Sequence, residues 1–326
     1  MKTRKADSLN VFTTCPASAM AEQAGSMKRL QDVSRWSEQA GCEGMLVFSD
    51  NRQLDPWLVS QAIIHSTDKL APLVAVQPAY MHPYTVAKMI ASIAYMYGRR
   101  IYLNMVAGGF KNDLEALNDP TPHDERYARL VEYTSIVQAL TGKPDSVSFG
   151  GRYYTINNLK LTPQLAPSLL PGVLVSGSSK AGMNAARQVS ATPVEYPQQA
   201  CEYSGLEHRA EVASGIRIGI VARDSDDEAW RAARLRFPED RKGQLTRKMA
   251  TKVSDSHWHK QLADMEDAAA RGEPYWMGPF NNYQAMCPYL VGSHATVAAE
   301  IQKYASVGFR TFILDEPEDR EDLFHS

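Results

Sequence analysis

The chain has 326 residues, of which 44% are hydrophobic and 22% charged, and its net charge is -2 at pH 7. This composition predicts a globular protein with a sizeable core and argues against nucleic acid or an anionic membrane as a partner. No apolar run approaches the roughly 20 residues that span a bilayer, and the first ten residues lack a signal-peptide core. The four cysteines have no zinc-like spacing, so we expect reduced thiols, no metal and a cytoplasmic location.

Strand-like and helix-like segments alternate in the first part of the chain. Apolar, β-rich runs that end at turn-forming residues predict four strands, at residues 9–14, 45–48, 73–77 and 101–106. The helix before the fourth strand has the clearest pattern, and Gly98 is predicted to end it. Its apolar face is formed by Val86, Met89, Ile90, Ile93, Ala94 and Tyr97. A long connection with another helix, up to Leu140, follows the fourth strand.

Four more strands are predicted in the second part, at residues 173–176, 192–196, 216–222 and 309–314. After the third of these, Ser225 and Glu228 have the S-x-x-E spacing of a capping box, which predicts the start of a helix. Residues 239–293 are rich in Lys, His, Trp and Tyr, and we expect them to form an insertion or lid region.

Eight strands, most of them followed by a helix, is the number found in a (β/α)8 barrel. An open, doubly wound sheet is the alternative, but no G-x-G-x-x-G follows the first strand and the eighth unit lies near the chain end. We therefore expect an α/β fold, a (β/α)8 TIM barrel formed by one domain over residues 1–326, with insertions after strands 4 and 7. In such a barrel, the functional site lies at the carboxyl ends of the strands.

The fifth predicted strand ends in a turn of small residues, Ser176-Gly177-Ser178-Ser179, which leads into a helix. Free backbone N–H groups at a helix N-terminus stabilise an anion, and small residues allow a phosphate to approach the backbone closely. Gly-Ser turns also end strands without any ligand. This stretch therefore predicts a phosphate site, with an ordinary strand-ending turn as the alternative.

Short segments along most of the chain resemble the bacterial-luciferase-like flavin monooxygenases, in particular the alkanesulfonate and nitrilotriacetate monooxygenase branch. The matching segments occur in family order and comprise Asp55–Val59, Pro83–Ala87, Tyr102–Gly108, His123–Tyr127, Gly177–Gly182, Asp226–Trp230 and Tyr304–Phe309. The family fold is a TIM barrel, in agreement with the strand count. The resemblance implies a monooxygenase that uses reduced FMN and O2 to oxygenate a small organic substrate.

The resemblance also implies partners and cofactor contacts. An NAD(P)H:FMN reductase would supply the reduced flavin, since the chain has no dinucleotide fingerprint of its own, and a homodimer or homotetramer is expected. Ser178 and Ser179 match the FMN phosphate contacts of the family. His123 and Tyr127 match its flavin contacts, and their i, i+4 spacing allows both to reach one ligand.

Three further residues have counterparts in the family. Asn104, at the end of the fourth strand, matches a polar residue that faces the flavin ring. Asp50 matches an acidic residue that follows the second strand in the nitrilotriacetate-type enzymes. Arg217 matches an arginine of the sulfonate enzymes, where a fixed cation stabilises negative charge that develops on oxygen. The resemblance thus implies catalytic roles for Arg217 and Asn104, and a cofactor-binding role for Asp50 and Asn104.

Several polar groups of the sulfonate enzymes are replaced in this chain. The histidine that follows their first strand falls near Ser18, and the histidine two residues after their strand-seven arginine falls at Gly219. Their active-site cysteine, which follows the second strand, falls at Gln53. The arginine of their mobile loop falls near Tyr283, and the tyrosine after their last strand falls at Pro317. We therefore expect a flavin site combined with a substrate other than a simple alkanesulfonate.

Other interpretations remain open at this point. One alternative is a flavin-binding protein of the same fold without turnover. A second is a barrel enzyme that binds a phosphorylated substrate at the loop after strand 5, and a third is a deazaflavin-dependent relative of the flavin monooxygenases. The aromatic stretch 275–291 predicts either a lid or a packing or oligomer surface. His257-Trp258-His259 favours a surface loop over a metal site, because no carboxylate pattern accompanies it.

Overall fold

The computed structural model describes residues 9–18, 23–108, 111–203, 214–253 and 273–324. The chain divides into two compact units, and we describe each by itself. Unit 1 comprises residues 1–14, 39–43 and 194–326, and unit 2 comprises residues 15–38 and 44–193.

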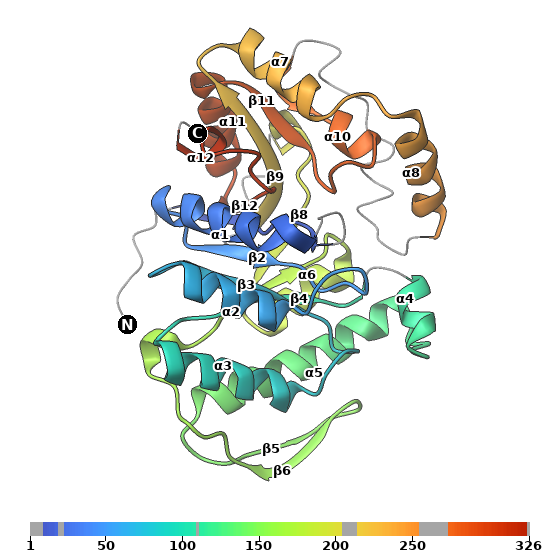
Figure 1. Cartoon of the computed structure of the whole chain (residues 1–326). Coiled ribbons are helices and arrows are strands. Elements are labelled where there is room, and N and C mark those ends of the chain that lie inside the picture. Colours follow the sequence, from blue (N-terminus) through green and yellow to red (C-terminus); the bar gives the residue numbers. More distant parts are fainter. Residues whose placement is uncertain (1–8, 19–22, 109–110, 204–213, 254–272, 325–326) are drawn as a thin grey trace. The chain divides into compact units, whose positions relative to one another are not determined.

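Unit 2 contains four parallel strands (Figure 1). In order across the sheet they are β2 (Gly44–Val47), β3 (Ala71–Val76), β4 (Tyr102–Val106) and β7 (Gly172–Ser176). Every residue of β2 and β3 is buried, as expected for parallel strands that are covered on both faces.

Helices alternate with these strands. They are α1 (Gln23–Gln39), α2 (Pro56–Ser66), α3 (Pro83–Tyr97), α4 (Lys111–Ala116), α5 (His123–Gly142) and α6 (Lys180–Gln188), and α5 packs against α3. The ends of α3 follow from its sequence: Pro83 fits the first turn, and Gly98 ends the helix in the left-handed conformation at φ 62°. An antiparallel hairpin of β5 (Val147–Gly150) and β6 (Thr155–Leu159) follows α5, and η2 (Pro167–Leu169) precedes β7.

Unit 1 contains four further parallel strands. Neighbouring strands pair in the order β1–β12–β9–β8, where the elements are β1 (Asn10–Thr14), β12 (Phe309–Leu314), β9 (Ser214–Arg223) and β8 (Thr192–Glu195). The accompanying helices are η3 (Ala200–Tyr203), α7 (Asp226–Arg236), α11 (His294–Ser306) and α12 (Glu321–Phe324). As the capping box predicts, the Ser225 side chain accepts the Glu228 N–H and starts α7.

The eight parallel strands and their helices give the α/β class of the (β/α)8 TIM barrel, as predicted. Of the predicted insertion 239–293, the structure describes α8 (Arg241–Val253), β10 (Tyr275–Trp276), α10 (Gly278–Asn281) and β11 (Tyr289–Ser293). We did not predict β11 as a strand. It pairs in parallel with the second half of β9, whereas the first half of β9 pairs with β12.

Candidate active site

The loop after β7 brings its backbone close to Tyr127 of α5. Gly177 has φ +149°, a conformation that favours glycine, and a Cβ there would lie 2.2 Å from the Tyr127 hydroxyl oxygen. A Cβ on Gly182 would lie 2.9 Å from the Gly177 carbonyl oxygen. Neither position accommodates a side chain, so both glycines are required for the turn into α6.

The two serines of this loop differ in their hydrogen bonds. The Ser179 hydroxyl accepts the Gly182 N–H at 3.1 Å, which caps α6, and shares a side-chain hydrogen bond with the Tyr127 hydroxyl. The Ser178 hydroxyl oxygen is buried and has no hydrogen-bond partner among the described residues. A buried hydroxyl that lacks a protein partner beside a helix N-terminus fits a bound anion, because the anion would satisfy it.

The first turn of α5 contributes the two predicted aromatic contacts. The rings of His123 and Tyr127 meet edge to face with centroids 5.3 Å apart, and His123 Nδ1 lies 2.7 Å from an Asp124 carboxylate oxygen. Burial raises the pKa of Tyr127, so its hydroxyl stays protonated and can donate a hydrogen bond. The structure thus brings together four of the six predicted cofactor residues, namely His123, Tyr127, Ser178 and Ser179.

Asn104 is connected to the same loop by a residue that sequence reasoning missed. Asn104 lies in β4, is 6% exposed, and its Oδ1 accepts the Ser176 hydroxyl at 2.8 Å. Ser176 is the last residue of β7 and directly precedes Gly177. Asn104 was predicted at the end of its strand, but it lies in the middle of β4, two residues before Val106, which pairs with Ser176. Residues two apart in a strand point to the same face, so a polar residue at each of these positions of the paired strands is the signal that would have identified this contact.

Asp50 lies in the turn after β2 and is engaged locally. Its Oδ1 accepts the Arg52 N–H at 2.8 Å, and its carboxylate forms a salt bridge with the Arg52 guanidinium at 3.2 Å. Burial and the charges of Asp113 and Asp50 raise the pKa of Tyr80, and Gln77 connects the Tyr80 hydroxyl to the Ser49 carbonyl. The structure therefore places Asp50 beside Tyr80 and Arg52.

Ser18 and Gln53, two of the residues that replace polar groups of the sulfonate enzymes in the sequence comparison, are hydrogen-bonded to each other. Gln53 Oε1 accepts both the Ser18 N–H, at 2.8 Å, and the Ser18 hydroxyl, at 2.9 Å. The same hydroxyl accepts the Leu54 N–H at 2.9 Å. Ser18 and Gln53 thus form a neutral hydroxyl–amide pair without a titratable group.

Arg217 lies within a buried polar cluster of unit 1. Its guanidinium forms a salt bridge with Asp315, with Nη2 3.0 Å from Oδ1, and donates to the Tyr196 hydroxyl at 3.3 Å. Asp315 also accepts the Tyr289 hydroxyl at 2.8 Å and a side-chain hydrogen bond from Cys287. Sequence reasoning identified Arg217 but none of these four partners as site residues.

Arg217 remains a cation although only 9% of it is exposed. Burial by itself would lower the pKa of Arg217, but Tyr196 and the Asp315 carboxylate outweigh that effect and raise it. Burial and the Asp315 charge raise the pKa of Tyr289, so its hydroxyl stays protonated and donates to Asp315. The cluster thus holds a fixed guanidinium in a protein interior, where its field is weakly screened.

The replacement at Gly219 has a packing explanation. A Cβ at this position would lie 2.3 Å from the ring of Tyr289, which β11 places against β9. The Tyr289 ring therefore occupies the space that any side chain at position 219 would need. This explains why a histidine cannot stand two residues after Arg217 in this chain.

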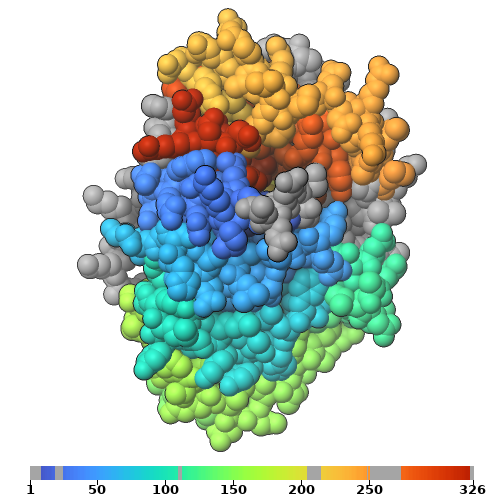
Figure 2. All heavy atoms as spheres, viewed as in Figure 1, coloured from blue at the N-terminus to red at the C-terminus, as the bar shows by residue number. Residues whose placement is uncertain are grey.

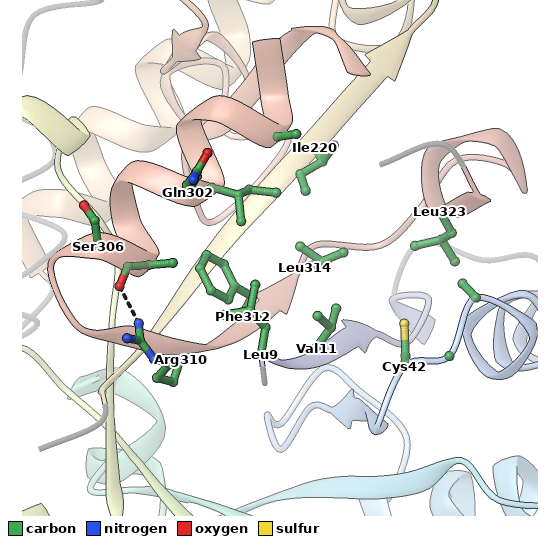
Figure 3. A pocket seen from close by; sticks show the side chains of 15 residues that line it. Leu9, Val11, Cys42, Ile220, Gln302, Ser306, Arg310, Phe312, Leu314 and Leu323 are labelled. Carbon is green, nitrogen blue, oxygen red and sulfur yellow. Dashed lines mark hydrogen bonds between the residues drawn. The ribbon is translucent and has the colours of Figure 1, made fainter. Parts of the chain in front are cut away.

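An apolar pocket of about 650 Å³ lies in unit 1 (Figure 3). Its lining includes Val11 of β1, Phe312 and Leu314 of β12, Ile220 of β9, Ile301 of α11, and Cys42. Successive residues of a strand point to opposite faces, and Arg217 pairs with Ile313, which lies between Phe312 and Leu314. The pocket is therefore separate from the Arg217 cluster.

Cys42 gives this pocket a pH-dependent property. Burial raises the pKa of its thiol from the ordinary 9.0 to about 11. A thiol whose pKa is higher in the folded protein stabilises the fold below pH 9, and this contribution disappears as the pH rises through 11. We expect the difference in unfolding free energy between wild type and Cys42→Ala to be constant below pH 9 and to decrease above it.

Urea denaturation between pH 7 and pH 11 measures this difference. The matched control is Cys201→Ala, because Cys201 is exposed. If the difference in unfolding free energy between wild type and Cys42→Ala does not change with pH, the pKa of the Cys42 thiol is not raised by burial.

The aromatic stretch 275–291 packs into the protein. Tyr275, Trp276, Met277 and Phe280 are each at most 8% exposed, and Trp276 and Cys287 belong to one core cluster with β9. This supports the packing alternative for these side chains, while a lid function stays a prediction. His257-Trp258-His259 lies outside the described residues.

Among the described residues, no three His, Cys, Asp or Glu residues cluster closely enough to hold a metal ion. None of the helices described for the protein is both long and apolar enough to cross a membrane.

Comparison with known proteins identifies the family. The model of the luciferase-like monooxygenase family matches residues 8–311, and the chain therefore belongs to this family of monooxygenases. A curated relative from Niallia circulans is 35% identical over 305 residues, which is 92% of this chain and 89% of the relative. That relative is named 4-(gamma-L-glutamylamino)butanoyl-[BtrI acyl-carrier protein] monooxygenase BtrO.

Solved structures share the fold at low identity. The EDTA monooxygenase EmoA from Chelativorans sp. BNC1 has a TM-score of 0.74 at 14% identity and covers 98% of this chain and 92% of its own. An F420-dependent secondary alcohol dehydrogenase has a TM-score of 0.67 at 17% identity and covers 98% of this chain and 97% of its own.

Proposed function

We propose that the protein is a reduced-FMN-dependent monooxygenase whose flavin comes from a separate NAD(P)H:FMN reductase. The observation that carries this proposal is the buried Ser178 hydroxyl, which has no partner among the described residues and lies beside the N-terminus of α6. Ser178 and the N–H groups of that turn would hold the FMN phosphate. When bound, the reduced flavin supplies the electrons that activate O2.

The remaining residues would orient the flavin and control charge. Ser176 fixes the Asn104 amide, so that its orientation toward a flavin ring would be set before binding. Tyr127 would position the phosphate loop, and His123 would contact the isoalloxazine. Asp50 would contribute a cofactor-binding carboxylate from the turn after β2. Arg217 would stabilise negative charge on oxygen, because Asp315 holds its guanidinium in a fixed position.

The substrate that we propose is an acyl group attached to an acyl carrier protein. The name of the 35% identical relative supports this substrate class. The neutral Ser18–Gln53 pair and the Gly219–Tyr289 contact argue only against a simple alkanesulfonate, because they leave no titratable group at these positions. Homodimer or homotetramer formation and a cytoplasmic location remain part of this proposal.

Oxygen-isotope labelling tests the proposed reaction. One atom of O2 enters the substrate and the other becomes water, with two electrons from reduced FMN. We expect the acyl thioester product to contain one oxygen-18 atom under 18O2, and only when the flavin reductase is present. Flavin oxidation without a labelled product from any thioester would instead favour a flavin-binding protein without turnover.

Two alternatives concern the phosphate loop. The first is a deazaflavin cofactor, which the F420-dependent dehydrogenase that shares the fold suggests. The second is a phosphorylated substrate, which the anion-binding geometry of the loop would also accommodate. Fluorescence titration with FMN separates both alternatives from the proposed function, since only an FMN-binding protein quenches FMN fluorescence.

A further inference from the structure

Helix α8 concentrates positive charge in a chain whose net charge is -2. Its sequence, RKGQLTRKMATKV, contains five basic residues and no acidic residue. By contrast, α7 begins with three acidic residues and has basic residues in its last turn. The charge of α8 is therefore not balanced within the helix.

One face of α8 packs against the segment around α10. A Cβ on Gly243 would lie 2.0 Å from the Asn282 carbonyl oxygen, so the helix backbone approaches this segment closely. Gln244 donates to Asn282 at 2.9 Å, and Arg247 donates to Asn281 at 2.7 Å with its guanidinium over the Phe280 ring. These contacts fix which side of the helix faces outward.

The outward face combines cations with apolar side chains. Leu245 and Met249 lie one turn apart, at i and i+4, and are 63% and 64% exposed. Arg241 and Lys242, also exposed, precede them in the first turn. We call these four residues the α8 surface, and the helix lies in the orange segment at the surface in Figure 2. Adjacent exposed apolar residues with cations beside them form a patch suited to an amphipathic acidic partner.

We propose that the α8 surface docks an acidic surface of an acyl carrier protein that delivers the substrate. This inference rests on the proposed function, which names the carrier-bound acyl group. Charge complementarity favours this occupant, because carboxylates of the carrier would pair with Arg241 and Lys242 while an apolar side chain would contact Leu245 and Met249. A second copy of the chain is a poor occupant, since two identical basic helices repel each other.

A lipid membrane is also a poor binding partner for the α8 surface. Interfacial helices bury a broad apolar face that includes residues such as Trp or Phe, whereas the α8 surface exposes two apolar side chains. The carrier protein is therefore the partner to test, with anionic vesicles as the competing outcome.

Binding of fluorescently labelled holo-BtrI, the carrier protein in the relative's name, tests the docking surface on the full chain. We expect salt-sensitive binding that Arg241→Glu with Lys242→Glu weakens about tenfold or more, and that Leu245→Ser with Met249→Ser also weakens. The matched controls lie on α7: Arg231→Glu reverses an exposed charge, and Leu235→Ser removes a leucine that is 84% exposed. We expect less than about a twofold change for either control.

Turnover separates docking from the chemistry. The α8 variants should lose kcat/KM for an acyl group on the carrier protein but keep it for the same acyl group on free pantetheine. Absence of BtrI binding to wild type, unchanged binding by the charge-reversed variant, or binding of phosphatidylserine vesicles instead would overturn the docking proposal. Carrier binding that depends on α8, with no oxygenation of either substrate, would retain the docking surface and reject the proposed function.

Discussion

Asp315→Ala will lower the free energy of unfolding by about 3–5 kcal/mol, because it leaves a buried guanidinium without its counter-ion. The side chains of Arg217 and Asp315 are only 10% and 12% exposed, so water cannot replace the lost carboxylate well. The hydroxyl of Tyr289 and the thiol of Cys287 lose their acceptor in the same substitution. Urea denaturation followed by circular dichroism measures the loss.

Two variants make this result specific. Asp315→Asn keeps an oxygen acceptor but removes the charge, so it should destabilise the protein less than Asp315→Ala does. Arg152→Ala breaks the salt bridge with Glu125, whose side chains are 69% and 40% exposed, and should cost about 0–1 kcal/mol. A loss for Asp315→Ala within the range of this exposed pair would show that the buried cluster does not depend on its carboxylate.

Ser178→Ala will weaken FMN binding by about 10–100-fold without lowering the stability of the apoprotein. A hydrogen bond to a charged group contributes about 1.5–3 kcal/mol, and this hydroxyl has no partner among the described residues whose loss would destabilise the fold. Ser179→Ala should behave differently. It removes the cap of α6 and the contact with Tyr127, so it should cost about 1 kcal/mol of stability in addition to FMN affinity.

Fluorescence titration with FMN and thermal unfolding of the apoprotein distinguish these two effects. The matched control is Ser225→Ala, since Ser225 caps α7 in the same way and is not part of the phosphate loop. It should lower stability by an amount similar to Ser179→Ala and leave the FMN dissociation constant unchanged. Equal FMN affinity of wild type and the Ser178→Ala, Ser179→Ala double variant would remove this loop from the site and make it an ordinary strand-ending turn.

The elements of the barrel were predictable because their signals are local. The apolar periodicity of α3 and its terminal Gly98 lie within one segment, and the structure ends the helix at that glycine. The capping box at Ser225 likewise needs only four residues. By contrast, the turn Ser176-Gly177-Ser178-Ser179 was predicted to lead into a helix, but Ser179 was not recognised as the N-cap residue that starts α6.

The partners of the site residues were not predictable in the same way. Asp315 lies 98 residues from Arg217, and Tyr289 lies in a segment that we predicted as an insertion rather than as a strand beside β9. Their pairing depends on strand register, which periodicity does not specify. The difference between Ser178 and Ser179 was also hidden, because only the geometry of Gly177, Gly182 and Tyr127 decides which hydroxyl is left for a ligand.

Anaerobic titration of the purified protein with reduced FMN, with F420 and inorganic phosphate as competitors, is the decisive measurement of cofactor binding. We expect one molecule of reduced FMN to bind per chain, with an affinity that Ser178→Ala weakens and that neither competitor matches. Failure to bind reduced FMN, or tighter binding of F420, would show that the loop after β7 is not an FMN site.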